Sequence, residues 1–256
     1  MIKAAFFDID GTLISHKDGT VPPDTREALQ QLQGKGILIY IASGRHILEY
    51  EELPVRDISF DGYVLLNGQL CMNKNKEELF SATIPQEDVE AILPLFEEKK
   101  IPIHLVEKDR LYINCEDSYT REAMKAISSP APEIGTYHGA DIYQVVVFGT
   151  TETIHRVTER MPHCKATLWN PYSVDVVRKD AGKVPGIQRM LDATGILPEE
   201  IIAFGDSEND LAMLEFAGIG VAMGNGSADV KEIADYVTDS AADGGIKHAL
   251  EHFGIL

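Results

Sequence analysis

The feature that most constrains the fold is an alternation of short apolar runs with helix-like stretches. Near the N-terminus the apolar run AAFF (4–7) precedes DTREALQQLQGKG (24–36), and ILIYIAS (37–43) and YVLLNG (63–68) follow. Continuous apolar runs of this length suit strands that are covered on both faces. Strands of this kind separated by helices predict a doubly wound parallel α/β sheet, a Rossmann-like core.

The same alternation returns near the C-terminus. We expect a helix at 184–195, a strand at 201–206, a helix at 211–218 and a strand at 220–224. The two ends of the chain therefore contribute to one sheet.

The first helix, at 24–36, carries its own start and stop signals. Asp24 and Glu27 fit a capping box, in which the two side chains satisfy the first backbone N–H groups. Gly34 and Gly36 predict where the helix ends.

The middle of the chain has a different pattern, in which a helix followed by a hairpin occurs twice. The expected elements are a helix at 86–99 weakened at Pro94, a hairpin at 103–115, a strand at 141–149, a helix at 151–161 and a hairpin at 165–179. This order predicts an α+β module with an antiparallel sheet. We expect residues 1–81 and 179–256 to form the α/β core and residues 82–178 to form the inserted module.

Charge and cysteine content narrow the possible partners. The chain has 23 basic and 41 acidic residues, a net charge of −18, which argues against nucleic acid or an anionic membrane as partner. An anionic substrate would need local positive charge. The cysteines Cys71, Cys115 and Cys164 have no metal-ligand spacing, and no apolar run approaches membrane-spanning length. No secretory apolar segment precedes Asp8, so we expect a reduced, cytoplasmic protein.

Polar side chains follow three of the predicted parallel strands. Asp8 and Asp10 follow the first strand, Ser43 follows the second, and Asp206 follows the strand at 201–206. Ligands of open α/β sheets bind outside the carboxyl ends of the strands, so these groups can converge on one crevice.

Each of these signals also has a purely structural reading. The stretch DIDGT (8–12) suits a solvated turn, and Ser207 with Asp210 fits a capping box. Clustered carboxylates are nevertheless costly unless a hard cation neutralises them, and oxygen ligands of this kind suit Mg²⁺. Together with a hydroxyl and a lysine, such a cation forms a receptor for a phosphoryl group.

Four segments resemble the motifs of the haloacid dehalogenase-like phosphatases. They are FFDIDGTL, IASGR, Lys183 after the inserted module, and GDSENDLAML. LLNGQL (65–70) and VAMGNGSADVKEIADYVT (221–238) are also similar to this family. Little chain separates the first two motifs and much separates the second from the third, which resembles the Cof-type sugar-phosphatase branch with an α+β cap at that position.

The resemblance implies a role for each matching carboxylate. Asp8 is expected to be the nucleophile, and Asp10 the general acid and then the general base. Mg²⁺ is expected to bind Asp8, the backbone carbonyl of Asp10 and Asp206, with Asp210 binding directly or through water.

The remaining matching residues are expected to bind substrate. Ser43 and Lys183 would bind phosphoryl oxygens, and Thr12 would orient Asp10 and its loop at that phosphate site. The substrate or residues next to it would be contacted by Arg45, Asn67 and Asn209.

The expected activity is Mg²⁺-dependent hydrolysis of a small-molecule phosphate ester through an aspartyl-phosphate intermediate. Sugar phosphates are the expected substrate class. The cap would set the substrate. One alternative is a phosphomutase or phosphotransferase on the same scaffold, and another is a non-catalytic regulator.

Overall fold

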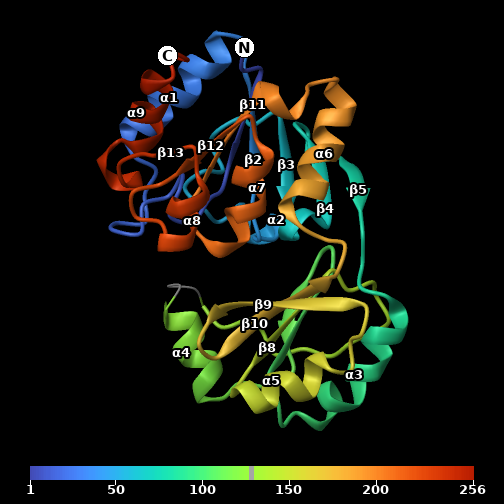
Figure 1. Cartoon of the computed structure of the whole chain (residues 1–256). Helices are drawn as coiled ribbons and strands as arrows, with labels where there is room; N and C mark the ends of the chain where they lie inside the picture. The colour runs from blue at the N-terminus through green and yellow to red at the C-terminus, as the bar shows by residue number, and fades with distance from the viewer. Residues whose placement is uncertain (127–129) are drawn as a thin grey trace. The chain divides into compact units, whose positions relative to one another are not determined.

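The computed structural model describes residues 1–126 and 130–256 and divides them into two compact units (Figure 1). The core unit consists of Met1–Ser81 and Gly182–Leu256, and the inserted unit of Ala82–Ala181. The core unit is built on a largely parallel sheet, and the inserted unit carries a separate antiparallel sheet. The predicted fold class, an α/β core with an inserted α+β module, is confirmed.

The described core residues form an eight-stranded sheet with the order β13-β12-β11-β1-β2-β3-β4-β5. From β13 to β3, every neighbouring pair is parallel. The strand bounds are β1 Ala4–Phe7, β2 Leu38–Ala42, β3 Gly62–Leu65, β4 Leu70–Asn73, β5 Glu78–Ser81, β11 Ile201–Gly205, β12 Ile219–Ala222 and β13 Tyr236–Val237.

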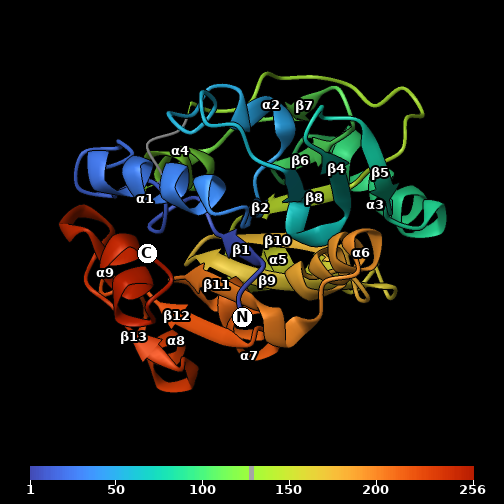
Figure 2. The same cartoon turned by 90° about the horizontal axis from the view of Figure 1, so that it is seen from above.

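Helices cover both faces of the core sheet (Figures 1 and 2). Phe6 packs in a buried cluster with α6, α7 and α8, whereas Phe7 points to the opposite face and stacks on Phe204. On that face α1 packs against β2 and lies beside α9. The helix bounds are α1 Pro23–Gly34, α2 Ile47–Tyr50, α6 Lys183–Thr194, α7 Leu211–Phe216, α8 Ala228–Ile233 and α9 Gly245–His252.

Two local features of the core differ from the sequence prediction. Strands β4 and β5 add an antiparallel hairpin to the edge of the parallel sheet, which the apolar pattern did not indicate. The Asp24 capping box was wrong, because α1 begins one residue earlier, at Pro23, and has no side-chain cap. Proline suits the first helical position, since it lacks the N–H group that would otherwise be unsatisfied there.

The inserted unit contains a five-stranded antiparallel sheet with the order β7-β6-β8-β10-β9. Helices α3 and α5 pack on one face of this sheet and α4 on the other. Both predicted hairpins are present, and α3 continues through Pro94. The bounds are α3 Gln86–Glu98, β6 Ile103–Val106, β7 Leu111–Ile113, α4 Ser118–Ala126, β8 Gln144–Phe148, α5 Thr151–Thr158, β9 Cys164–Asn170 and β10 Ser173–Arg178.

None of the helices within residues 1–126 and 130–256 has the length and apolar character that crossing a membrane requires.

Candidate active site

The candidate site lies at the carboxyl edge of the core sheet, where three adjacent parallel strands end. Phe7 of β1 is in register with Phe204 of β11 on one side and with Ile41 of β2 on the other. The polar residues that follow these strands, Asp8 and Asp206 among them, therefore leave the sheet at the same edge. Sequence reasoning had expected this convergence.

Asp8 and Lys183 form a buried ion pair at the centre of the site. Lys183, the first residue of α6, donates from Nζ to Asp8 Oδ1 at 2.6 Å and to Asp210 Oδ1 at 2.6 Å. Burial alone would lower the pKa of Lys183, but attraction to Asp210 and Asp8 outweighs it and raises that pKa. The lysine therefore stays charged between two carboxylates.

Burial also acts on Asp8, which is 5% exposed. It raises the pKa of Asp8 well above the usual value; Lys183 opposes this effect, while the neighbouring carboxylates of Asp210, Asp206 and Asp10 add to it. A single lysine thus leaves excess negative charge in the site.

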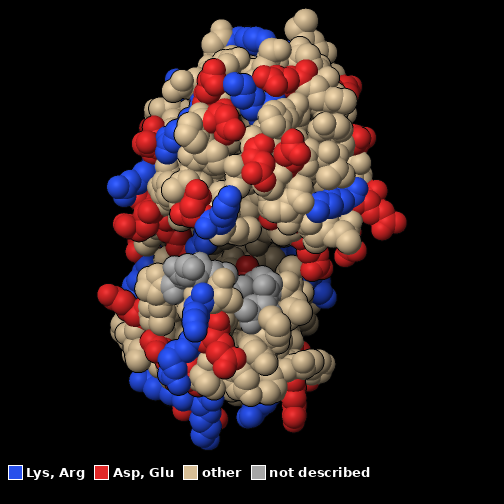
Figure 3. Space-filling model, turned by 90° about the vertical axis from the view of Figure 1, so that its left-hand side faces the viewer, with Lys and Arg blue, Asp and Glu red and all other residues tan. Residues whose placement is uncertain are grey.

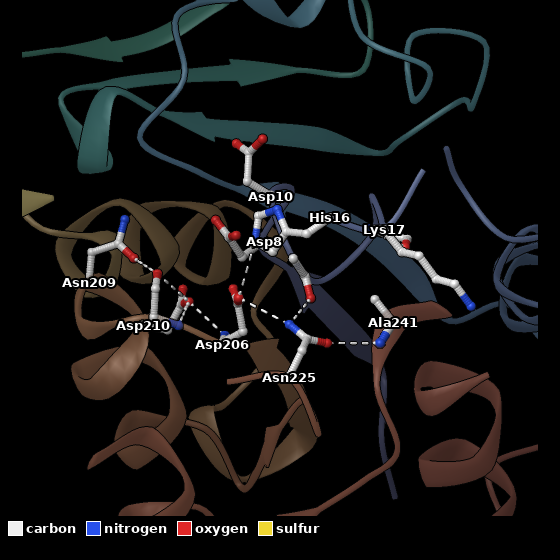
Figure 4. Close-up of polar contacts among 12 residues, drawn as sticks. Asp8, Asp10, His16, Lys17, Asp206, Asn209, Asp210, Asn225 and Ala241 are labelled. Atoms are coloured by element: carbon white, nitrogen blue, oxygen red, sulfur yellow. Dashed lines mark hydrogen bonds and ion pairs between the residues drawn. The ribbon is translucent and has the colours of Figure 1, made fainter. Parts of the chain in front are cut away.

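The surroundings of Asp206 also lack enough positive charge to balance its carboxylate. Its pKa is raised to about 7, first by burial and then by repulsion from Asp210, with Lys183 opposing. Its Oδ2 accepts a hydrogen bond from Asn225 Nδ2 at 3.2 Å, and His16 Nε2 lies 3.7 Å from the same oxygen (Figure 4). Its Oδ1 is buried and meets no hydrogen-bond donor in good geometry among the described residues, although the nearby Thr12 hydroxyl lowers the pKa of this carboxyl in part.

Asp8, Asp206 and Asp210 could hold a cation together, because one oxygen from each lies within 4.8 Å of the others. Asp210 is already engaged, however. Its Oδ1 binds Lys183, and its Oδ2 accepts the backbone N–H groups of Asp206 and Ser207 at 2.9 and 3.0 Å. The buried Oδ1 of Asp206, the raised pKa of that carboxyl and the all-oxygen donor set fit a hard divalent cation such as Mg²⁺.

Asp10 is held by Arg45 in a two-pronged ion pair. Arg45 donates from Nε to Asp10 Oδ2 at 2.9 Å and from Nη2 to Asp10 Oδ1 at 3.0 Å. Arg45 Nη1 also lies 3.6 Å from Glu49 Oε1 in α2. Paired N–H groups of this kind fix the orientation of a carboxylate as well as its position.

Ser43 and Thr12, the two predicted hydroxyl groups, are buried. Ser43 Oγ accepts the backbone N–H of Arg45 at 3.2 Å, which closes the turn after β2. Thr12 Oγ1 is buried and makes no hydrogen bond of good geometry with the described residues, but its hydroxyl is close enough to the Asp206 carboxyl to lower the pKa of that group.

Two predicted asparagines meet at the margin of the site. Asn209 Nδ2 donates to Asn67 Oδ1 at 3.3 Å, although the residues are far apart in sequence. Asn67 has a φ of 52°, a left-handed conformation that asparagine tolerates better than most residues. The contact joins the segment after β3 to the segment after β11.

Sequence reasoning missed Asn225 and His16 as neighbours of the predicted carboxylates. Asn225 lies between two glycines in the stretch GNG (224–226), just after β12, the strand next to β11. This position at a strand end, in a segment similar to the family, was the available signal. His16 lies beyond the first motif and offered no signal of its own.

The surface charge around the core is mixed. On the face drawn in Figure 3, acidic side chains are interspersed with basic ones over the upper part, and several basic side chains gather on the lower part. In a chain with a net charge of −18, Lys183 and Arg45 supply local positive charge beside the carboxylates of the site.

A buried lysine between carboxylates that could hold a cation, at the end of an α/β sheet, is an arrangement suited to phosphoryl transfer. Comparison with known proteins gives the family. The model of the haloacid dehalogenase-like hydrolases matches residues 5–250, and the chain belongs to this family.

Individual relatives cover the whole chain. YkrA of Bacillus subtilis (strain 168), a protein named as a phosphatase, is 30% identical over 99% of this chain and 98% of its own length. The 5-amino-6-(5-phospho-D-ribitylamino)uracil phosphatase YitU of the same organism is 27% identical over 96% of this chain and 95% of its own. The solved structure of the subclass IIB sugar phosphatase BT4131 has a TM-score of 0.86 and 36% identity, covering 99% of this chain and 100% of that chain. The predicted family and enzyme class, a haloacid dehalogenase-like phosphatase, are therefore confirmed.

Proposed function

We propose that this chain is a Mg²⁺-dependent phosphomonoesterase that hydrolyses small phosphorylated metabolites, with sugar phosphates as the substrate class. The observation that carries the proposal is the excess of buried carboxylate at the end of β1 and β11, where Asp206 Oδ1 meets no donor in good geometry among the described residues. The similarity to a sugar phosphatase over nearly the whole chain supports the substrate class.

Asp8 is the nucleophile in this proposal. One of its carboxylate oxygens attacks phosphorus, the bond from phosphorus to the leaving oxygen breaks, and an aspartyl-phosphate forms. Lys183 holds Asp8 Oδ1 at 2.6 Å and offsets the charge that accumulates when the phosphoryl group arrives. Water then attacks phosphorus, the bond from phosphorus to the Asp8 oxygen breaks, and inorganic phosphate leaves while the Asp8 carboxylate is regenerated.

Asp10 carries the proton in both steps. Its carboxyl group gives a proton to the leaving oxygen in the first step and takes one from water in the second. The Arg45 fork, at 2.9 and 3.0 Å, keeps this side chain oriented between the steps. Asn67 and Asn209, which contact each other, lie where they can bind the substrate or support its loop.

The phosphoryl group is bound by Ser43 and Lys183, with Thr12 supporting the loop at the phosphate site. Mg²⁺ would be held by Asp8, the Asp10 carbonyl and Asp206, with Asp210, whose oxygens are already hydrogen-bonded, reaching it through water. The ion would neutralise charge on the phosphoryl oxygens. The close approach of one oxygen each from Asp8, Asp206 and Asp210, within 4.8 Å of one another, supports this assignment.

The inserted unit, which the sequence places at residues 82–178, is proposed as the cap that sets the substrate. It has its own antiparallel sheet and its own buried core, so it can vary without disturbing the catalytic sheet. A cytoplasmic location, expected from the sequence, agrees with a small metabolite as substrate.

Release of p-nitrophenol from p-nitrophenyl phosphate tests the proposal. We expect turnover with Mg²⁺, loss of turnover with EDTA and a loss of about a thousandfold or more in Asp8→Asn. Asp57→Asn, which changes an exposed aspartate of the core surface, is the matched control and should keep full activity. A panel of sugar phosphates then tests the substrate class.

Two results would contradict the proposal. Absence of turnover on every phosphate ester of the panel would overturn the phosphatase activity. Full activity of Asp8→Asn would overturn the aspartyl-phosphate. Transfer of the phosphoryl group to a sugar in preference to water would instead indicate a phosphotransferase.

A further inference from the structure

We infer that Asn225 is a positioning residue for the divalent-cation site: it fixes the orientation of the Asp206 carboxylate and holds the loop that follows Asp10. This inference rests on the metal-dependent phosphatase proposed above. It concerns a residue outside the motifs to which roles were assigned, on the segment after β12.

The amide of Asn225 makes three hydrogen bonds to three different segments of the core unit (Figure 4). Its Oδ1 accepts the backbone N–H of Ala241 at 2.9 Å. Its Nδ2 donates to the carbonyl oxygen of Gly11 at 2.8 Å and to Asp206 Oδ2 at 3.2 Å. A backbone N–H can only donate, so Ala241 determines which end of the amide is oxygen and turns Nδ2 toward the site.

The contact with Asp206 distinguishes the two oxygens of that carboxylate. Oδ2 is occupied by Asn225, whereas Oδ1 is buried and meets no donor in good geometry among the described residues. The two oxygens of a carboxylate are chemically equivalent, so the distinction is between the two positions that they occupy. One oxygen position is bound to an amide and the other is left for a cation.

The contact with Gly11 holds the loop of the first motif against Asp206. Gly11 has a φ of 81°, and a Cβ atom placed there would lie 2.1 Å from Asp206 Oδ2. The loop can therefore approach this closely only with glycine. The peptide held by Asn225 is the one that follows the Asp10 carbonyl, a proposed ligand, so a single amide links two parts of the cation site.

Asn225 can be removed without emptying the core. It is exposed, and together with His16 and Ala241 it lines a pocket of about 340 Å³ in the core unit. Truncating an exposed side chain leaves no buried cavity, so the loss should fall on the site more than on folding. A role limited to tying down the segment at Ala241 would instead change stability and leave cation binding unchanged.

The experiment measures Mn²⁺ binding by electron paramagnetic resonance in the metal-stripped, substrate-free protein, beside the Mg²⁺ dependence of p-nitrophenyl phosphate hydrolysis. For Asn225→Ala we expect the cation dissociation constant to rise about tenfold or more, as for other groups that orient metal ligands. Saturating Mg²⁺ should restore most of kcat, and the thermal midpoint of the metal-free protein should stay close to that of the wild type.

Asn73→Ala is the matched control. Asn73 also makes three side-chain hydrogen bonds in the core unit, to Asn75 N, Glu77 N and Glu77 Oε2, but in the turn between β4 and β5. Its cation constant should stay within about twofold of the wild type.

Ala241→Pro is a second variant, which removes the N–H group that orients the amide at the first position of a short 3₁₀ helix, where proline is tolerated. It should weaken cation binding in the same direction as Asn225→Ala. An unchanged constant in both variants would overturn the inference while leaving the proposed phosphatase intact. A wild-type protein that binds no cation and hydrolyses nothing would instead overturn the proposed function.

Discussion

Two buried aspartates, one in each unit, have opposite environments. In the inserted unit Asp88 is 1% exposed, and both of its oxygens bind His163, Oδ1 to the ring Nδ1 at 2.9 Å and Oδ2 to the backbone N–H at 3.0 Å. In the core, Asp206 is 7% exposed, and its buried Oδ1 meets no hydrogen-bond donor in good geometry among the described residues. The first carboxylate is satisfied by the chain, and the second is not.

The difference separates a structural charge from a functional one. A buried carboxylate that is fully hydrogen-bonded stabilises the fold around it. One that stays unpaired costs free energy, and its pKa rises, as that of Asp206 does to about 7. A site of this kind gains stability when a cation binds. Four substitutions test this contrast.

Lys183→Met should have the largest effect. It leaves Asp8 and Asp210 facing each other in a buried site without the ammonium that binds both at 2.6 Å. Breaking a buried ion pair on one side costs about 3–5 kcal/mol, and hydrolysis should fall by more than about a hundredfold. Chemical denaturation and p-nitrophenyl phosphate turnover measure the two losses. A variant as stable and active as the wild type would show that the core carboxylates do not depend on Lys183 for their positive charge.

Asp206→Asn should stabilise the metal-free protein at high pH. The folded pKa of Asp206, about 7, lies above its usual value of 3.8, so the stability that this group contributes is complete below about pH 4 and is lost as the pH rises through 7. The variant should therefore gain about 1–2 kcal/mol over the wild type at pH 8 and little at pH 5. Thermal denaturation in EDTA at both pH values measures this gain. A loss of stability at pH 8 would be evidence against an unsatisfied Asp206.

Asp88→Ala should act in the opposite direction. It removes the acceptor for the ring and backbone N–H groups of His163 and should cost about 2 kcal/mol. The cost should be the same with and without Mg²⁺, since this aspartate belongs to the inserted unit. Denaturation with and without Mg²⁺ measures it. Loss of Mg²⁺ binding in this variant would contradict the prediction, because it would give Asp88 a role in the cation site.

His163→Gln should have the smallest effect, visible only in the pH profile. Hydrogen bonding to Asp88 raises the pKa of His163 above 6.5. The protonated ring therefore adds stability that is fully present below about pH 6.5 and is lost as the pH rises through the folded pKa. The variant should show a flatter thermal midpoint across that window. An unchanged slope would indicate that the ring does not titrate against Asp88.

Much of the site could be predicted because it depends on strand ends. Asp8, Ser43 and Asp206 each follow an apolar run, and parallel strands bring such residues to one edge. The hydrogen bond that Arg45 donates to Asp10, in contrast, depends on side-chain rotamers, which no spacing encodes. Asn225 also follows a strand, but its partner Gly11 is distant in sequence, so their contact could not be predicted from spacing.

The edge strands of the core sheet and the start of α1 were predicted less well than the site. Strands β4 and β5 are short and partly polar, so their hairpin resembles an ordinary turn in the sequence. The start of α1 was misplaced because Pro22 and Pro23 specify the backbone there more strongly than Asp24 does.

The central claim is that Asp206 is a carboxylate that a cation stabilises. The most direct test is to titrate Mg²⁺ into the metal-stripped protein at pH 7.5 and to measure the thermal midpoint at each concentration, for the wild type and for Asp206→Asn. The account predicts that the midpoint of the wild type rises with Mg²⁺ concentration and that the midpoint of the variant stays flat. A wild-type midpoint that does not respond to Mg²⁺, or the same rise in both proteins, would contradict it.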